Sequence, residues 1–238
     1  MRIGYPEVMD LAMTYEDAKS TRSAQSHSLS LTDRRRLTVS GVEDVESFDE
    51  DAVVLDTNGG TLTVLSNAQD AVGDTMNAGT IVVHGSIGDA AGYAMRGGKI
   101  YVRGNAGYRA GIHMKAYQDH VPVIVIGGRA GTFLGEYQAG GLIIVLGLHT
   151  DGRPIVSNFP CTGMHGGKLF LRSKCEDVLF PEQVTPRAAT PEDLEEITGC
   201  LKEYCGLFGL DLRAILDAPF TVVTPNSANP YKQMYVAN

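Results

Sequence analysis

The sequence predicts an all-β solenoid, a parallel β-helix of about six to seven coils with a small C-terminal helical cap. Three observations predict this fold: a glycine-marked repeat of about nineteen residues, alternating apolar residues within each repeat, and a high glycine content. Glycine supplies 28 of the 238 residues, about 12% against a usual value of roughly 7%. Because 43% of the residues are also hydrophobic, the glycine indicates a fold with many tight turns rather than a disordered chain.

A strand-like hexapeptide recurs along the chain, and nineteen residues separate most successive copies. Two longer steps need only loop insertions, near Ala116–His120 and Asp151–Cys161. The copies are Gly60–Leu65, Gly79–His84, Gly98–Arg103, Pro122–Gly127, Gly141–Leu146 and Gly167–Arg172. The third and fifth residues of every copy are apolar, so alternation places both on one face of a strand. Such faces at a fixed repeat can stack and bury one continuous core.

A second pattern, GxxGxxxG, follows three of these hexapeptides in register. Its members are Gly85, Gly88, Gly92, Gly104, Gly107, Gly111, Gly128, Gly131 and Gly135. We expect these glycines to form the turns of the coils, where the chain reverses sharply and adjacent coils approach closely. A dinucleotide-binding fold is disfavoured, because the next strand begins too soon for the long helix that such a fold requires after its glycine turn.

The segments that flank the repeats differ from them in period. The sequence predicts residues 1–36 to be an N-terminal arm or irregular cap, 37–180 the β-helix, and 181–238 a helical hairpin cap with an extended tail. Leu37–Leu55 is typical of lead-in strands. Gly41 lies nineteen residues before Gly60, which favours a degenerate first coil.

The C-terminal region contains helix signals. Thr190 is a candidate N-cap, with proline at the first helical position and acids in the first turn. Apolar residues then follow at helical spacing until Gly206 and Gly209 break the pattern. Asp211–Asp217 is predicted to be a second short helix. We expect this hairpin to close the last coil, since an open solenoid end exposes apolar surface and unpaired strand edges.

The middle residue of each predicted strand should point away from the core of its coil. After the polar Thr63, these residues form a mostly apolar stripe of Val82, Tyr101, Val125, Ile144 and Phe170. A monomer rarely leaves such a stripe in water. Either another part of the chain or a partner must cover it, and we favour a partner because few residues are spare. The stripe is therefore the candidate partner interface.

Composition and motifs argue against several functions. The net charge of −8 disfavours nucleic-acid binding, and no apolar run is long enough to span a membrane. The start of the chain lacks the pattern of a signal peptide, and its cysteines form no CxxC pair, which favours a cytoplasmic protein with reduced thiols. No hydrolase, metalloprotease or phosphate-loop motif occurs. We assign no catalytic, cofactor-binding or metal-binding residue to this chain.

Two local features leave alternatives open. His113 and His120 flank an insertion and could converge on a metal, although surface histidines are the commoner case. Gly163–Gly167 could form a tight turn before a strand, or could let a ligand or partner chain approach bare backbone.

The repeat is clearest in GDTMNAGTIVVHGSIGDAAGYAMRGGKIYVRGNAGYRAG and resembles the GXGXG domain over about residues 55–175. GMHGGKLFLR at Gly163–Arg172 and PFTVVTPNSANPYKQMY at Pro219–Tyr235 are similar to the stand-alone, glutamate synthase domain 3-like subunit of archaeal-type glutamate synthases. The formylmethanofuran dehydrogenase subunit that shares this domain is the chief rival.

The resemblance implies a right-handed parallel β-helix with a structural role in a glutamate-synthase-like complex. In that enzyme one domain frees ammonia from glutamine, and a flavin domain fed by iron–sulfur centres adds it reductively to 2-oxoglutarate. The β-helix domain braces these parts, so FMN and iron–sulfur clusters are expected in partner subunits and no cofactor in this chain. The partners would be amidotransferase and flavin-synthase subunits, or a second copy of the chain. A free-standing β-helix binding module is a further alternative.

Overall fold

The computed structural model describes residues 28–32, 36–40, 42–48, 53–57 and 60–227. The chain divides into two compact units, residues 1–60 and 61–238, and each has its own organisation. Most of the predicted arm at residues 1–36, as well as Gly41, lies outside the described residues.

The first unit contains two short antiparallel pairs. β1 (Ser28–Thr32) pairs with β2 (Arg36–Ser40), and β3 (Val42–Phe48) pairs with β4 (Val53–Thr57). Strands therefore occur where lead-in strands were predicted. Their antiparallel pairing differs from the parallel pairing expected of a degenerate first coil.

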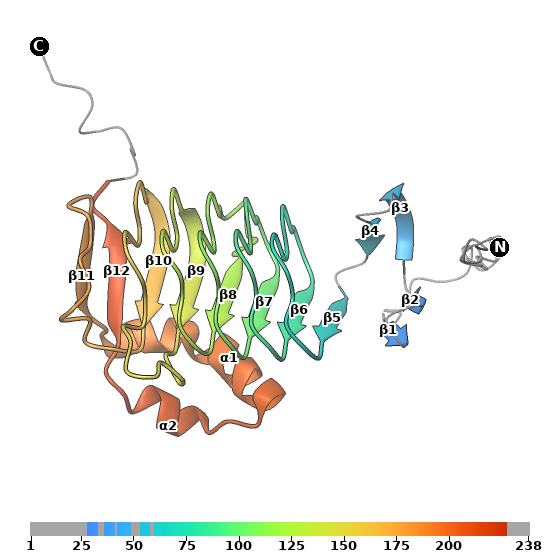
Figure 1. The fold of residues 1–238 in the computed structure, drawn as a ribbon. Helices are drawn as coiled ribbons and strands as arrows, with labels where there is room; N and C mark the ends of the chain where they lie inside the picture. The colour runs from blue at the N-terminus through green and yellow to red at the C-terminus, as the bar shows by residue number, and fades with distance from the viewer. Residues whose placement is uncertain (1–27, 33–35, 41, 49–52, 58–59, 228–238) are drawn as a thin grey trace, which may run out of the picture. The chain divides into compact units, whose positions relative to one another are not determined.

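The second unit is built on one eight-stranded sheet in the order β11-β12-β10-β9-β8-β7-β6-β5 (Figure 1). Its strands are β5 (Thr61–Val64), β6 (Thr80–Val83), β7 (Lys99–Val102), β8 (Val123–Ile126), β9 (Ala139–Val145), β10 (Gly166–Leu171), β11 (Val184–Ala188) and β12 (Thr221–Pro225). β5 to β10 pair parallel, and β12 and β11 continue the sheet antiparallel beyond β10. The structure confirms a mostly β chain with one large, largely parallel sheet.

The register of the parallel ladder follows the sequence repeat. Ile81 pairs with Ile100, Ile100 with Ile124, and Ile124 with Ile143. Identical positions of successive hexapeptides therefore stack, and the longer step between β7 and β8 leaves the register unchanged. Ile100, Ile124 and Ile143 are fully buried in one continuous core.

Side-chain oxygens connect one repeat to the next outside the sheet. The Asn67 amide oxygen accepts a hydrogen bond from the Ser86 N–H at 2.9 Å, and the Ser86 hydroxyl accepts one from the Asn105 N–H at 3.0 Å. The Asn105 amide oxygen in turn accepts from the Arg129 N–H at 2.8 Å. A row of isolated parallel bridges joins Ile87, Ala106, Ala130 and Val156. Each repeat is thus bonded to its neighbour at a turn as well as at the strand, which satisfies the backbone groups of the turns.

The GxxGxxxG glycines have two different physical roles. Gly92, Gly111 and Gly135 have left-handed φ values of 68°, 72° and 65°, which residues with a side chain rarely adopt. Gly104 has no such φ; instead, a Cβ there would lie 2.5 Å from Ser86 Oγ and 2.7 Å from the Gly85 carbonyl oxygen. Similar crowding against the preceding repeat occurs at Gly85, Gly88, Gly107, Gly128 and Gly131. These six glycines allow neighbouring repeats to approach closely.

Two helices follow β11, where helices were predicted. α1 (Pro191–Phe208) has Thr190 as its N-cap and ends at Gly209, whose φ is 66°; it continues through Gly206, which was expected to interrupt it. α2 (Leu212–Leu216) has Asp211 as its N-cap. The helices pack along the sheet rather than at its end (Figure 1). The prediction of a helical cap at the end of the sheet was therefore wrong, because β12 and β11 extend the sheet at that end.

Candidate functional site

The predicted partner interface is buried inside the chain. Val82, Tyr101, Val125, Ile144 and Phe170 are each at most 1% exposed. They share a hydrophobic cluster with C-terminal residues, namely Ile197, Leu201, Tyr204, Cys205, Ile215, Phe220 and Val222. The stripe does need a cover, but α1, α2 and the β12 segment of the same chain supply it. The assignment of these residues to a partner interface was therefore wrong.

The helix covers the stripe because its own apolar residues recur at helical spacing. Ile197, Leu201 and Tyr204 are fully buried on one side of α1. Burying each such side chain contributes roughly 1.5–3 kcal/mol. The sequence displayed this spacing, but an amphipathic pattern does not tell which surface a helix will cover.

Polar contacts also hold α1 over the sheet. Lys99 Nζ lies 2.7 Å from the Glu203 carboxylate, and Lys168 Nζ lies 2.5 Å from that of Glu196. The Tyr101 hydroxyl donates to Glu203 at 2.8 Å. Lysines beside the stripe are thus paired with acids of the helix that covers it.

Burial governs the protonation of the cysteine thiols. It raises the pKa of Cys200 to about 11, and it raises the pKa of Cys161, Cys175 and Cys205 as well. All four cysteines are free. A protonated thiol is a weak nucleophile and a weak metal ligand, so these side chains contribute packing.

His113 and His120 have different neighbours. The His113 ring stacks on the Tyr137 ring, with centroids 5.2 Å apart and planes 8° apart, whereas His120 forms a β-bridge with Tyr117. Within the described ranges, no group of three or more histidine, cysteine or acidic side chains gathers as a metal site would require. No helix among those residues is long and apolar enough to cross a membrane.

The Gly163–Gly167 turn is occupied by neighbouring parts of the chain. Gly163, with φ 69°, lies against the Tyr137 ring, so a side chain there would collide with it. At Gly167, with φ 76°, a Cβ would lie 2.5 Å from the Gln138 Nε2 atom. Close approach of the preceding repeat accounts for both glycines, which favours the tight-turn alternative.

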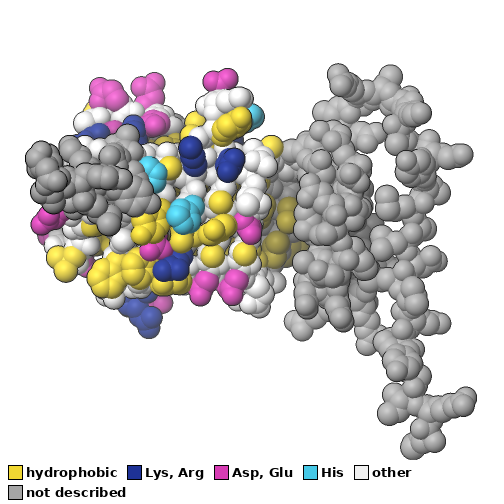
Figure 2. All heavy atoms as spheres, turned by 90° about the horizontal axis from the view of Figure 1, so that it is seen from above, with side chains coloured by type: hydrophobic (Ala, Val, Ile, Leu, Met, Phe, Trp, Pro, Cys, Tyr) yellow, Lys and Arg dark blue, Asp and Glu magenta, His cyan; other side chains and the backbone are white. Residues whose placement is uncertain are grey.

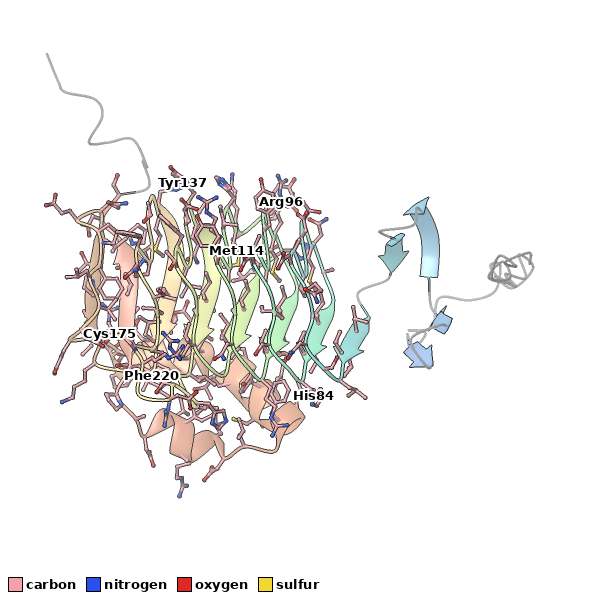
Figure 3. All side chains as sticks on the ribbon, in the orientation of Figure 1. His84, Arg96, Met114, Tyr137, Cys175 and Phe220 are labelled. Carbon is pink, nitrogen blue, oxygen red and sulfur yellow. The ribbon has the colours of Figure 1, made fainter. Side chains whose placement is uncertain are left out.

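Sequence reasoning missed an aromatic surface on the turns. Tyr93, Tyr108, Tyr137 and Phe159 are between 37% and 61% exposed, although none belongs to a strand. Figure 3 places Tyr137 and Arg96 at the edge of the repeats that is opposite His84. Figure 2 looks onto that edge and shows hydrophobic, histidine, basic and acidic side chains there. An alignment of the repeats that included the turns would have shown that aromatic residues recur there at equivalent positions.

The comparisons with known proteins give a family and one relative. A family model described as the GXGXG motif matches residues 50–226. Uncharacterized protein MJ1350 from Methanocaldococcus jannaschii is 44% identical over 129 residues, which cover 52% of this chain and 49% of that protein. The chain spans about half the length of the curated relative that it matches.

Proposed function

Because the chain belongs to the GXGXG motif family, we propose that it is a non-catalytic structural subunit of a glutamate-synthase-like complex. The GXGXG domain is found in glutamate synthase-like proteins. In the proposed complex, an amidotransferase subunit releases ammonia from glutamine and a flavin-synthase subunit uses it to aminate 2-oxoglutarate. FMN and iron–sulfur clusters belong to the partners, and this chain braces them.

The proposal includes a finer description of the fold. The stacked hexapeptides and the row of turn bridges from Ile87 to Val156 are successive sides of right-handed coils, and the described repeats form a parallel β-helix. Support comes from the nineteen-residue register shared by the strands and the turns. An experimental structure that shows any other connection between the strand and the turn rows would contradict this description.

One observation carries the proposed role: polar side chains of the turns bond from repeat to repeat and stiffen the stack. The Asp70 carboxylate accepts a hydrogen bond from the Asp89 N–H at 2.7 Å, and the Asp89 carboxylate accepts one from the Tyr108 N–H at 2.7 Å. With the row that starts at Asn67, two side-chain links join each neighbouring pair among the first three repeats. A stack linked at strand and turn suits a part that must hold two catalytic subunits at a fixed separation.

The test is purification of the tagged chain from its native cell, followed by mass spectrometry of the proteins that accompany it. We expect a flavin-synthase chain and an amidotransferase chain in amounts comparable to the bait, and neither in an untagged control. A metal-dependent amidohydrolase with a formyltransferase would instead assign the chain to a formylmethanofuran-type complex. Recovery of the chain by itself would contradict the proposal.

A further inference from the structure

The turns of five successive repeats line up along one edge of the second unit. We call these turns the hooks; they are residues 71–75, 90–94, 109–113, 133–137 and 159–163. In every hook the first, third and fifth residues have a left-handed φ. Because all five hooks share this alternation, equivalent side chains project from equivalent positions of successive repeats.

The later hooks carry bulky residues at positions where a small residue would cause less backbone strain. At the first and fifth positions, the first two hooks have only alanine or threonine. In the next three hooks, five of these six positions carry larger residues with φ between 52° and 60°, and the sixth is Gly163. The larger residues are Arg109, His113, Phe133, Tyr137 and Phe159. A left-handed φ is unfavourable for a bulky residue, and such strain concentrates at functional sites.

Exposed rings form two rows across the hooks. In the first row, the His113 ring centroid lies 6.0 Å from that of Tyr93 and 5.2 Å from that of Tyr137. The second row, with centroid distances of 5.6 Å and 5.2 Å, consists of Tyr108, Phe133 and Phe159. Phe159 is 61% exposed. Rings of this kind supply most of the binding energy in many protein interfaces.

Backbone hydrogen bonds fix the hooks to one another. The His113 N–H donates to the Glu136 carbonyl at 2.9 Å, and the Tyr137 N–H donates to the Thr162 carbonyl at 2.8 Å. The Ala94 N–H makes the same kind of bond to the next hook at 2.9 Å. The rings are therefore held in place before any partner binds, which lowers the entropy cost of binding.

The hook edge also carries cations without acidic partners. Arg96 and Lys115 are exposed, each two residues beyond a hook, and the Lys115 N–H donates to the Met95 carbonyl of the preceding repeat at 2.9 Å. Neither makes an ion pair with any described residue, whereas the Glu136 carboxylate is buried and lies 2.8 Å from Arg109 Nε. Arg96 and Lys115 lie nineteen residues apart, at equivalent positions of adjacent repeats. Like charges repel, so an external carboxylate would stabilise both.

We propose that the hook face, made of the two ring rows with Arg96 and Lys115, is the docking surface for a partner protein that presents carboxylates. Rigid exposed rings supply apolar contact, and the two cations supply charge complementarity and orientation. The net charge of −8 opposes a nucleic-acid partner. The proposal rests on the proposed function, which makes this carboxylate-bearing partner a catalytic subunit of the complex.

The test measures the affinity of the full chain for each purified catalytic subunit from the same organism. The charge variant is R96E/K115E, and its matched control is K174E/K202E, which changes the net charge equally at two exposed lysines away from the hooks. Circular dichroism and urea melts establish that both variants fold. We expect the hook variant to raise Kd by about tenfold or more and the control to stay within about twofold of wild type.

A second variant, Y137A/F159A, tests the rings and should weaken the same complex at any salt concentration. Raising the salt from about 50 mM to about 300 mM should weaken wild-type binding, because salt screens the charges. The difference in affinity between wild type and R96E/K115E should therefore become smaller. Equal affinity of wild type and both hook variants would overturn the docking surface and leave the proposed function intact. A wild-type chain that binds neither subunit would overturn both. Tighter binding of nucleic acid than of either subunit would overturn the choice of a protein partner.

Discussion

The Tyr101 hydroxyl donates a hydrogen bond to the Glu203 carboxylate at 2.8 Å, which joins the centre of β7 to helix α1. Tyr101 is 1% exposed, and burial, followed by the hydrogen bond to Glu203, raises its pKa well above the usual range. On the other side of this contact, Lys99 and then Tyr101 hold the pKa of Glu203 below its ordinary value. The outward stripe of the sheet is therefore an internal interface between strands and helix.

A charge on that stripe should destabilise the fold itself. We expect Ile144→Asp to lower the free energy of unfolding by about 3 kcal/mol or more, because it buries an unpaired carboxylate where Ile144 is fully enclosed. Thr63→Asp is the matched control, since Thr63 has the same repeat position in the exposed strand β5, and it should change stability by less than about 0.5 kcal/mol. Urea melts of both variants provide the comparison. Wild-type stability of Ile144→Asp would mean that α1 does not cover the stripe in solution.

Substitution by alanine should change the stability of the fold in opposite directions at Gly104 and Gly199. Gly104→Ala should cost about 1–3 kcal/mol, because its Cβ would lie 2.7 Å from the Gly85 carbonyl oxygen and the repeats would have to move apart. Gly199 lies in helix α1, and an added Cβ there would meet nothing within 4 Å, so Gly199→Ala should stabilise by up to about 1 kcal/mol. Thermal melts measure both. A stable Gly104→Ala chain would show that the repeats are not in close contact at this turn.

The hooks should gain stability when a strained residue becomes glycine. Ala94 has a φ of 49°, which costs an alanine more than a glycine. We expect Ala94→Gly to raise the free energy of unfolding by up to about 1 kcal/mol, the difference between relieved strain and the larger entropy of glycine in the unfolded chain. Ala91 is buried in the same hook without a positive φ, so Ala91→Gly should destabilise. Equal destabilisation of both variants would show that the backbone of Ala94 is not strained in solution.

Acid should loosen the start of helix α1. The Arg187 guanidinium, and then the Thr190 N–H, hold the pKa of Asp193 well below its usual range. A carboxylate with a lowered folded pKa contributes stability that is fully present above its unfolded pKa, about 3.9, and is lost as pH falls below that value. The urea midpoint of wild type should therefore fall as the pH is lowered from about 5. The urea midpoint of Asp193→Asn should be lower than that of wild type at neutral pH and should change less with pH. Parallel pH profiles for the two proteins would contradict this role.

The sequence predicted the parallel ladder well because its signal is local and repeated. Ile81, Ile100 and Ile143 share one template position, and the structure pairs that position from strand to strand. The helix start at Thr190 was also readable, since capping depends on the adjacent residues alone. Of the two glycines predicted to end the helix, Gly206 and Gly209, only Gly209 does so.

The docking of α1 was not predictable in the same way. Its apolar face fits any apolar surface, and polar contacts such as those of Tyr101 and Lys99 with Glu203 select the stripe. The hooks escaped detection for another reason. Residues such as Phe133 and Tyr137 have left-handed backbones, a conformation that sequence patterns assign to glycine.

The central claim is that this chain supports a reaction carried out by other chains. The most direct measurement is glutamine-dependent glutamate formation by the purified flavin-synthase and amidotransferase subunits, with and without the full chain. We expect addition of the chain to raise the coupled rate, while the chain alone forms no glutamate. A coupled rate that is unchanged by the chain, or glutamate formation by the chain alone, would contradict the account.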